Sequence, residues 1–242
     1  MSKKEINQNT NYDSEFTNLI GAKFIFNERP INRLKNDSII SFKEETTIKE
    51  KKLNQLINEI NSIEDCSLKN NSKNVVLGDG NINSSIMLIG EAPGIEENKS
   101  GKTFMGDVGD LLKKMLIAIN IKKENIYSTY AVNFRPPEDR KPTSVEIKRY
   151  SLYLQKHISI IKPKIIILMG SSAMEALTGL NKNISIERGK WKEIIVKNTN
   201  YNVLITFSPS YLLRVPENKK YSWEDLKIIQ KKIDALGLKD KL

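Results

Sequence analysis

Short apolar runs alternate with helical patterns from about residue 75 to the end of the chain. The runs at 86–89 and 164–169 are continuous, which predicts strands buried on both faces of a sheet. Further strands are predicted at 75–77, 125–132, 194–196 and 203–206, and helices at 107–119, 143–161, 171–177 and 223–236. This alternation predicts a three-layer α/β/α sandwich with a central, mostly parallel sheet.

The first 45 residues lack this pattern. They are polar and aperiodic, so we expect a flexible N-terminal extension. From residue 46 onward, apolar positions such as Leu53, Leu56 and Ile60 recur at helical spacing. We therefore expect a helix over 46–61 at the start of a folded domain that comprises residues 46–242.

Three loops that follow predicted strands carry most of the unusual residues, at 90–106, 133–142 and 208–214. The carboxyl ends of parallel strands meet at one edge of a sheet, and ligands of open α/β sheets bind at that edge. The first loop begins with Gly90-Glu91-Ala92-Pro93-Gly94, where glycines allow close approach of a ligand and Glu91 is the one acid of the turn. The sequence therefore predicts one cleft, with Glu91 in it.

Composition narrows the chemistry of that cleft. The chain has 242 residues, one cysteine (Cys66), one histidine (His157) and a net charge of +10. One cysteine excludes an internal disulfide framework and a four-cysteine metal site within the chain. Most of the charge lies beyond residue 60, which favours a polyanionic partner such as nucleic acid, although a general richness in lysine would give the same excess.

Membrane and secretory signals are missing from the sequence. No apolar run approaches the roughly 18–20 residues that span a bilayer, and the N-terminus lacks the apolar core of a signal peptide. We expect a soluble, cytoplasmic monomer.

Three separated segments together resemble the family 4 uracil-DNA glycosylases. They are G-E-A-P-G followed by G-x-x-F-x-G-x-x-G-x-L-L over 90–112, R-P-P-x-x-R-x-P over 135–142, and T-x-S-P-S-x-L-L-R over 206–214. The resemblance covers about residues 50 to 232. It implies an enzyme of base-excision repair that flips uracil out of single- or double-stranded DNA and hydrolyses its bond to deoxyribose.

The resemblance also implies roles for residues in the cleft. Glu91 stands where the family's acid orients or activates water, and Phe104 where the flipped uracil stacks. The backbone at Gly90 and Ala92 would hydrogen-bond the base edge. The alternatives are ordinary ones, in which Glu91 stabilises the turn and Phe104 packs in the core.

The remaining implied contacts are with DNA. Pro209 and Ser210 would approach the backbone, and Leu212, Leu213 and Arg214 would wedge into the space that the base leaves. Arg135, Arg140 and Lys141 suit phosphates. The alternative for the two leucines is that they begin a helix and face the core. The alternative for the three basic residues is that they lie in a solvated charged loop.

Two departures from the family concern the cofactor and the base. The four cysteines that bind a four-iron cluster correspond here to Ile63, Cys66, Phe134 and Tyr150, so no cluster, cofactor or metal is expected. The family's base-reading asparagine corresponds to Tyr130, and its histidine to Ser208. We expect Asn133 to face away from the base, since it lies three residues along the strand.

These departures leave the function open at this stage. An active glycosylase, of altered rate or specificity, is the first hypothesis. A catalytically weak or inactive protein that binds DNA or damaged bases is the second, and a small nucleotide-binding protein is the third. We expect His157 to be structural or exposed.

Overall fold

The computed structural model describes residues 37–238, and residues from Lys43 onward belong to one compact unit. Its centre is a six-stranded sheet in the order β1-β3-β2-β4-β6-β5. The strands are β1 (Gly78–Gly80), β2 (Ile86–Gly90), β3 (Tyr127–Tyr130), β4 (Ile165–Met169), β5 (Trp191–Val196) and β6 (Thr199–Thr206). The four inner strands are parallel, and β1 and β5 pair antiparallel at the two edges. The predicted mostly parallel sheet is confirmed.

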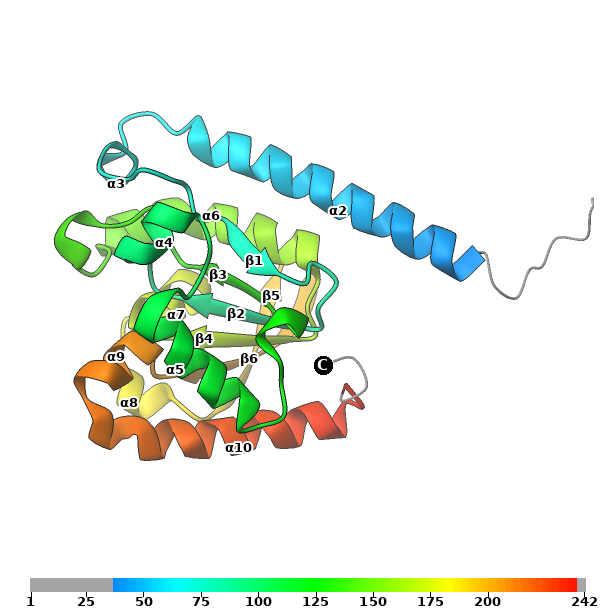
Figure 1. Cartoon of the computed structure of the whole chain (residues 1–242), viewed down its shortest axis with the longest axis vertical. Helices are drawn as coiled ribbons and strands as arrows, with labels where there is room; N and C mark the ends of the chain where they lie inside the picture. Colours follow the sequence, from blue (N-terminus) through cyan, green and yellow to red (C-terminus); the bar gives the residue numbers. More distant parts are fainter. Residues whose placement is uncertain (1–36, 239–242) are drawn as a thin grey trace, which may run out of the picture. The chain divides into compact units, whose positions relative to one another are not determined.

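Helices cover both faces of this sheet (Figure 1). They are α2 (Asp37–Asn61), α3 (Ser67–Asn70), α4 (Ile95–Ser100), α5 (Gly106–Ile117), α6 (Ser144–Ile161), α7 (Ser171–Thr178), α8 (Ile184–Glu187), α9 (Pro209–Arg214) and α10 (Lys219–Ala235), with 3-10 turns at Lys123–Asn125, Pro137–Asp139 and Pro216–Asn218. Helices α6 and α7 share one apolar cluster with the sheet, and α5 and α10 share the other. These are the three layers that the sequence predicts.

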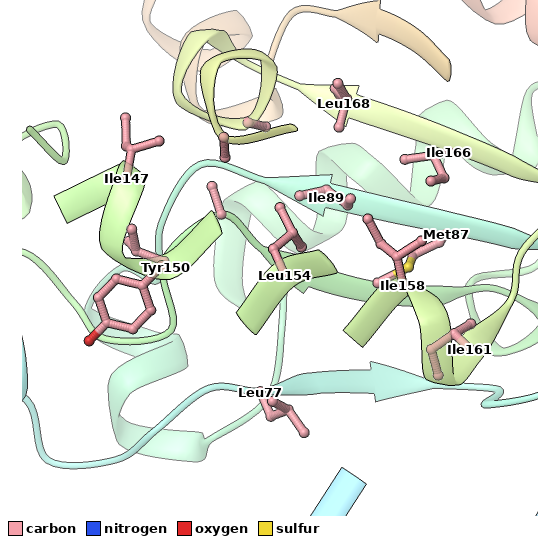
Figure 2. Close-up of a cluster of buried hydrophobic side chains, with 14 of the residues drawn as sticks. Leu77, Met87, Ile89, Ile147, Tyr150, Leu154, Ile158, Ile161, Ile166 and Leu168 are labelled. Carbon is pink, nitrogen blue, oxygen red and sulfur yellow. The ribbon is translucent and has the colours of Figure 1, made fainter. Parts of the chain in front are cut away.

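The alternation of side chains along each strand separates the two clusters. Met87 and Ile89 of β2 lie beside Ile166 and Leu168 of β4 on the α6 side, as Figure 2 shows. The intervening residues, such as Leu88, join the α5 and α10 side. Both faces of β2 and β4 are therefore buried, which explains the continuous apolar runs of these two strands.

The register of the inner strands aligns the start of the predicted loops. Gly90 at the end of β2 is paired with Tyr130 at the end of β3, and Met169 of β4 is paired with Thr206 of β6. Glu91, Gly170 and Ser208 consequently leave the sheet at one edge, within two residues of the last paired position.

Several boundaries differ from the prediction. The strand predicted at 75–77 lies instead at Gly78–Gly80 (β1), because it is this backbone that pairs with β3. Helix α10 begins at Lys219, since the 3-10 turn at Pro216 leads directly into it. Helix α6 begins where the sequence predicts, at a capping box in which Thr143 Oγ1 accepts from Glu146 N and the Glu146 carboxylate accepts from Thr143 N.

The first helix is longer than expected. It begins at Asp37 instead of residue 46, so residues 37–45 of the predicted extension are helical. Residues 1–36 lie outside the described part of the chain. Among residues 37–238, no helix has the length and hydropathy needed to cross a membrane.

His157 is structural and is not exposed. Its side chain is buried under β3, where Nε2 lies 2.9 Å from the hydroxyl of Tyr127. Burial lowers the pKa of His157 to about 3, so the imidazole is neutral at pH 7. It lies outside the cleft and takes no part in the site.

Candidate active site

An open cleft of about 230 Å³ lies at the carboxyl edge of the sheet. All three predicted loops contribute to it. Its lining is Gly90–Gly94, Glu97, Phe104, Val108, Tyr130, Pro136, Asp139–Pro142, Ser208–Ser210 and Arg214. The prediction of one shared cleft with Glu91 in it is confirmed.

Glu91 lies at the end of β2 and is held there by hydrogen-bond donors that follow β4 and β6. Its Oε1 accepts from Ser172 N at 3.1 Å and from the hydroxyls of Ser171 and Ser172 at 3.2 and 3.3 Å. Its Oε2 accepts from Ser208 Oγ at 3.0 Å. Both oxygens are thus fixed while the side chain stays half-buried at the cleft, where it can hold a water molecule.

Two glycines make room for this arrangement. A Cβ on Gly170 would lie 2.3 Å from Glu91 Cδ, and the φ of +110° at Gly170 is also unfavourable for other residues. A Cβ on Gly90 would lie 2.6 Å from the ring of Tyr130 and 2.9 Å from that of Phe104. Glycine is therefore required beside both the carboxylate and the aromatic wall.

Ser208 links the acid to helix α9. Its hydroxyl donates to Glu91 and accepts from Tyr211 N at 3.3 Å, which makes Ser208 the N-cap of that helix. Ser210 Oγ lies 3.2 Å from it. A serine at this position contacts the acid directly, so its short side chain is sufficient to reach it.

Phe104 and Tyr130 form the opposite wall of the cleft. Their ring centroids are 5.0 Å apart and tilted by 39°, and only 3% and 4% of the two residues is exposed. Phe104 lines the cleft and also packs in the core on the α5 side, so the packing alternative is confirmed and stacking stays a prediction. The face that a flipped base could contact is a small part of its ring.

The phenol of Tyr130 is already engaged within the protein. It accepts from Phe104 N at 2.9 Å and donates to Glu97 Oε1 at 3.4 Å. Burial, followed by the nearby Glu97 charge, raises the pKa of Tyr130 well above its usual value, so the phenol stays protonated. Asn133 faces away, as expected, because its Nδ2 donates to Val76 O.

The two arginines of the second loop pair with nearby acids, whereas Lys141 Nζ donates to Ser171 Oγ at 3.2 Å. Arg135 makes a two-pronged contact with Asp139 at 2.7 and 2.9 Å, and Arg140 does the same with Glu146 at 2.9 and 2.7 Å. The Arg140 contact is the main cause that lowers the pKa of Glu146 to about 2. Arg135 is not part of the cleft lining, whereas Arg140 is.

The third loop divides its residues between the core and the surface. Leu212 is 1% exposed and packs in the core, which corrects its predicted role in a DNA wedge. The reason is that Pro209–Arg214 is helical, so successive side chains point in different directions. Leu213 is 40% exposed, and Arg214 and Ser210 line the cleft; Pro209 lines it as well, although it is largely buried.

Four residues stand at the positions that correspond to the family's cluster-binding cysteines. We call them the Tyr150 corner: Ile63, Cys66, Phe134 and Tyr150. Cys66 Sγ and Tyr150 Oη lie 3.2 Å apart, and the rings of Phe134 and Tyr150 meet edge to face at 6.3 Å. Ile63 packs against the same apolar cluster. One thiol among apolar and aromatic side chains does not fit an iron–sulfur cluster, and no group of three metal ligands occurs within residues 37–238.

Sequence reasoning did not identify Ser171, Ser172 and Glu97. The two serines follow β4 and Gly170 at the edge where the other loops lie, so the rule that found those loops also applies to them. Glu97 carries a weaker signal, as the third residue of α4 after Gly94, where an acid often accepts from the preceding backbone.

Comparison with known proteins agrees with this geometry. Residues 77–230 match the family model of the uracil DNA glycosylase superfamily. The chain is 37% identical over 154 residues to a type-4 uracil-DNA glycosylase of Thermotoga maritima, covering 64% of this chain and 79% of the relative. It is 32% identical over 181 residues to that of Archaeoglobus fulgidus, covering 73% and 91%.

A third relative is a larger protein, of which only a part is similar to this chain. A DNA polymerase of Bacillus phage SP01 is 31% identical over 164 residues, which are 67% of this chain and 17% of the polymerase. The family model covers more than half of the chain, and the type-4 relatives are matched over most of their own length. The chain belongs to the uracil-DNA glycosylase superfamily.

Proposed function

We propose that this protein is a uracil-DNA N-glycosylase that flips uracil, or a related deaminated base, out of DNA and initiates base-excision repair. The observation that carries the proposal is the fixed position of Glu91 at the mouth of the cleft, with donors on both carboxylate oxygens. Type-4 uracil-DNA glycosylases that cover most of this chain support the same activity.

Hydrolysis in this cleft follows from the position of the acid. As the bond between N1 of uracil and C1′ breaks, uracil departs with the electron pair and positive charge develops on the sugar. Glu91 stabilises that charge and orients a water whose oxygen bonds to C1′, while the water proton passes to the carboxylate or to solvent. Main-chain groups at Gly90 and Ala92 contact the base, and Phe104 stacks on it.

DNA approaches over the loops that border the cleft. Leu213 and Arg214 are exposed at its rim and would fill the gap left by the flipped base. Arg135 and Arg140 would exchange their carboxylate partners for phosphates, which is feasible because surface ion pairs contribute little stability. We propose a cytoplasmic monomer that acts on uracil in single- and double-stranded DNA.

We further propose that the enzyme works without an iron–sulfur cluster or any other cofactor. The packing of the Tyr150 corner supports this, since Phe134 and Tyr150 occupy positions where the family has ligands. Iron and acid-labile sulfide measured on protein reconstituted under anaerobic conditions should be far below one cluster per chain. A stoichiometric amount would contradict the proposal.

A cleavage assay tests the proposed function. Oligonucleotides with uracil in a single strand, opposite guanine or opposite adenine are incubated with protein and scored for abasic sites, with thymine as the control base. Glu91→Gln should lower the single-turnover rate by about 10²- to 10⁴-fold. DNA binding with no abasic sites on any of these substrates would instead favour a non-catalytic damage-binding protein.

A further inference from the structure

The wall that carries Phe104 depends on an unusual backbone conformation. Phe104 has a φ of +50°, in the left-handed region that a bulky aromatic residue rarely adopts. Such a residue is retained only where its surroundings enforce the conformation, and residues of this kind are frequent at functional sites. The contacts that enforce it therefore indicate which residues position the wall.

Three groups hold the peptide units on both sides of Phe104. Its N–H donates to Tyr130 Oη at 2.9 Å, and the next N–H, of Met105, donates to Glu97 Oε1 at 2.8 Å. Lys123 Nζ donates at 3.0 Å to the carbonyl oxygens of both Thr103 and Phe104. We call Glu97, Lys123 and Tyr130 the Phe104 clamp.

A glycine on helix α5 completes the fit. A Cβ on Gly109 would lie 2.0 Å from Phe104 O, so this carbonyl can approach the helix only because the position is glycine. The Gly109 position therefore explains part of the G-x-x-G spacing that follows Phe104 in the sequence.

Glu97 connects this wall to the loop of the catalytic acid. It is 5% exposed, and no ion pair to it is formed within residues 37–238. Oε2 accepts from Gly94 N at 3.0 Å, and Oε1 accepts from both Met105 N and Tyr130 Oη. One buried carboxylate thus binds the G-E-A-P-G turn, the Phe104 loop and the end of β3 together.

We propose that Glu97 is a positioning residue that fixes Phe104 and Tyr130 as a preformed wall of the base pocket and thereby sets the affinity for the flipped base. This inference rests on the proposed function and assigns no chemical step to Glu97. A preformed wall requires no ordering when the base enters, so its loss should weaken ground-state and transition-state binding alike.

The variant Glu97→Gln tests the clamp with little risk to the helix. Glutamine can still accept from Gly94 N, as it does in many capping boxes, but its NH2 group then faces the N–H of Met105. The matched control is Glu96→Gln, which makes the same change at the exposed neighbour on the same helix. In steady-state cleavage of a uracil oligonucleotide, Glu97→Gln should raise KM about tenfold with kcat changed much less. Glu96→Gln should behave as the wild type.

A second measurement does not depend on activity. Hydrogen exchange in the segment 103–105 should be about tenfold faster in Glu97→Gln than in Glu96→Gln, since a hydrogen-bond acceptor is lost. Tyr130→Phe, which removes one hydroxyl, should produce a similar acceleration, and it provides the same test if Glu97→Gln does not fold. The double variant should be less impaired than the product of the two single effects.

The outcomes separate the clamp from the proposed function. If the wild type cleaves no uracil substrate but exchange is faster in Glu97→Gln, the enzyme assignment fails and the clamp stands. If the wild type cleaves uracil and Glu97→Gln matches Glu96→Gln in KM and in exchange, the clamp is overturned. A loss confined to kcat, with KM unchanged, would also overturn it, because Glu97 would then act in the chemical step.

Discussion

The cleft around Glu91 and the Tyr150 corner use opposite kinds of interaction. The cleft lies where the inner strands end, whereas the corner combines residues before α3, after β3 and on α6. In the cleft, a half-buried carboxylate is surrounded by hydroxyl and amide donors, beside a glycine with a φ of +110°. In the corner, Tyr150 is 1% exposed among apolar and aromatic neighbours.

This difference indicates that the cleft is constrained by chemistry and the corner by packing alone. The cleft keeps strained and polar features that do not help folding, as is typical of a site selected for chemistry. The corner has only to fill space, and aromatic packing with one thiol does so. Changes in the cleft should therefore alter activity more than stability, and changes in the corner should do the reverse.

The largest effect is expected for Tyr150→Ala. Removing a buried aromatic ring leaves a cavity, so the free energy of unfolding should fall by about 3–5 kcal/mol in urea titrations. The control is Leu152→Ala, since Leu152 is 65% exposed on the same helix. If single-turnover cleavage per folded molecule also fell strongly in Tyr150→Ala, the corner would not be independent of the cleft.

Next in size is Gly170→Ala. The added Cβ would displace the Glu91 carboxylate, and a shift of about 1 Å in a catalytic group can lower the rate about 100-fold. Gly179→Ala is the matched control, because its φ is +68° but nothing lies within 4 Å of the new Cβ. Equal rates in single-turnover assays of the two variants would show that the position of Glu91 is not critical.

The buried His157 makes the free energy of unfolding depend on pH, which gives a further test of the packed part of the molecule. The pKa of His157 is lowered to about 3 in the folded protein, against about 6.5 in the unfolded chain, so only the unfolded chain binds this proton between those values. The free energy of unfolding should therefore fall below pH 6.5, by about 2 kcal/mol at pH 5. His157→Gln should lose this part of the slope in urea titrations at pH 5 and 7, and an unchanged slope would contradict the account.

The smallest effect concerns Ser208→Ala. Loss of one neutral donor to Glu91 should slow single-turnover cleavage about tenfold, and loss of the N-cap should lower the unfolding free energy by about 1 kcal/mol. Ser159→Ala removes a hydroxyl that is bound to Lys156 O on α6, outside the cleft lining, and should leave the rate unchanged. A Ser208→Ala rate equal to that of Ser159→Ala would remove Ser208 from the site.

The sequence predicted the layers and the shared cleft because both depend on local patterns. Continuous apolar runs marked the buried strands β2 and β4, and glycines marked where these two strands end. The edge strands were harder to predict, since the pairing of Gly78–Gly80 with β3 depends on a neighbour that is distant in sequence. The early start of α2 was missed because residues 37–45 do not show the apolar spacing used to locate it.

Within the site, the sequence identified the residues that belong to motifs. It missed the residues that hold the motif residues in place by hydrogen bonds. Glu91 and Ser208 were named, but their mutual contact depends on the β2–β4 and β4–β6 registers. Leu212 was misassigned because a motif does not reveal which leucine of a short helix faces inward. The internal hydrogen bonds of Tyr130 require the folded positions of Phe104 and Glu97, which no spacing rule provides.

The most direct test of the account is the release of free uracil by wild-type protein that contains no iron. Uracil is quantified by mass spectrometry in a single-turnover reaction with a uracil oligonucleotide, on protein whose metal content has been measured. We expect uracil in an amount equal to the abasic sites formed, without bound iron and with Glu91→Gln slower by about 10²- to 10⁴-fold. Release only from iron-loaded protein, or no release at all, would contradict the claim that the cleft around Glu91 is a complete glycosylase site.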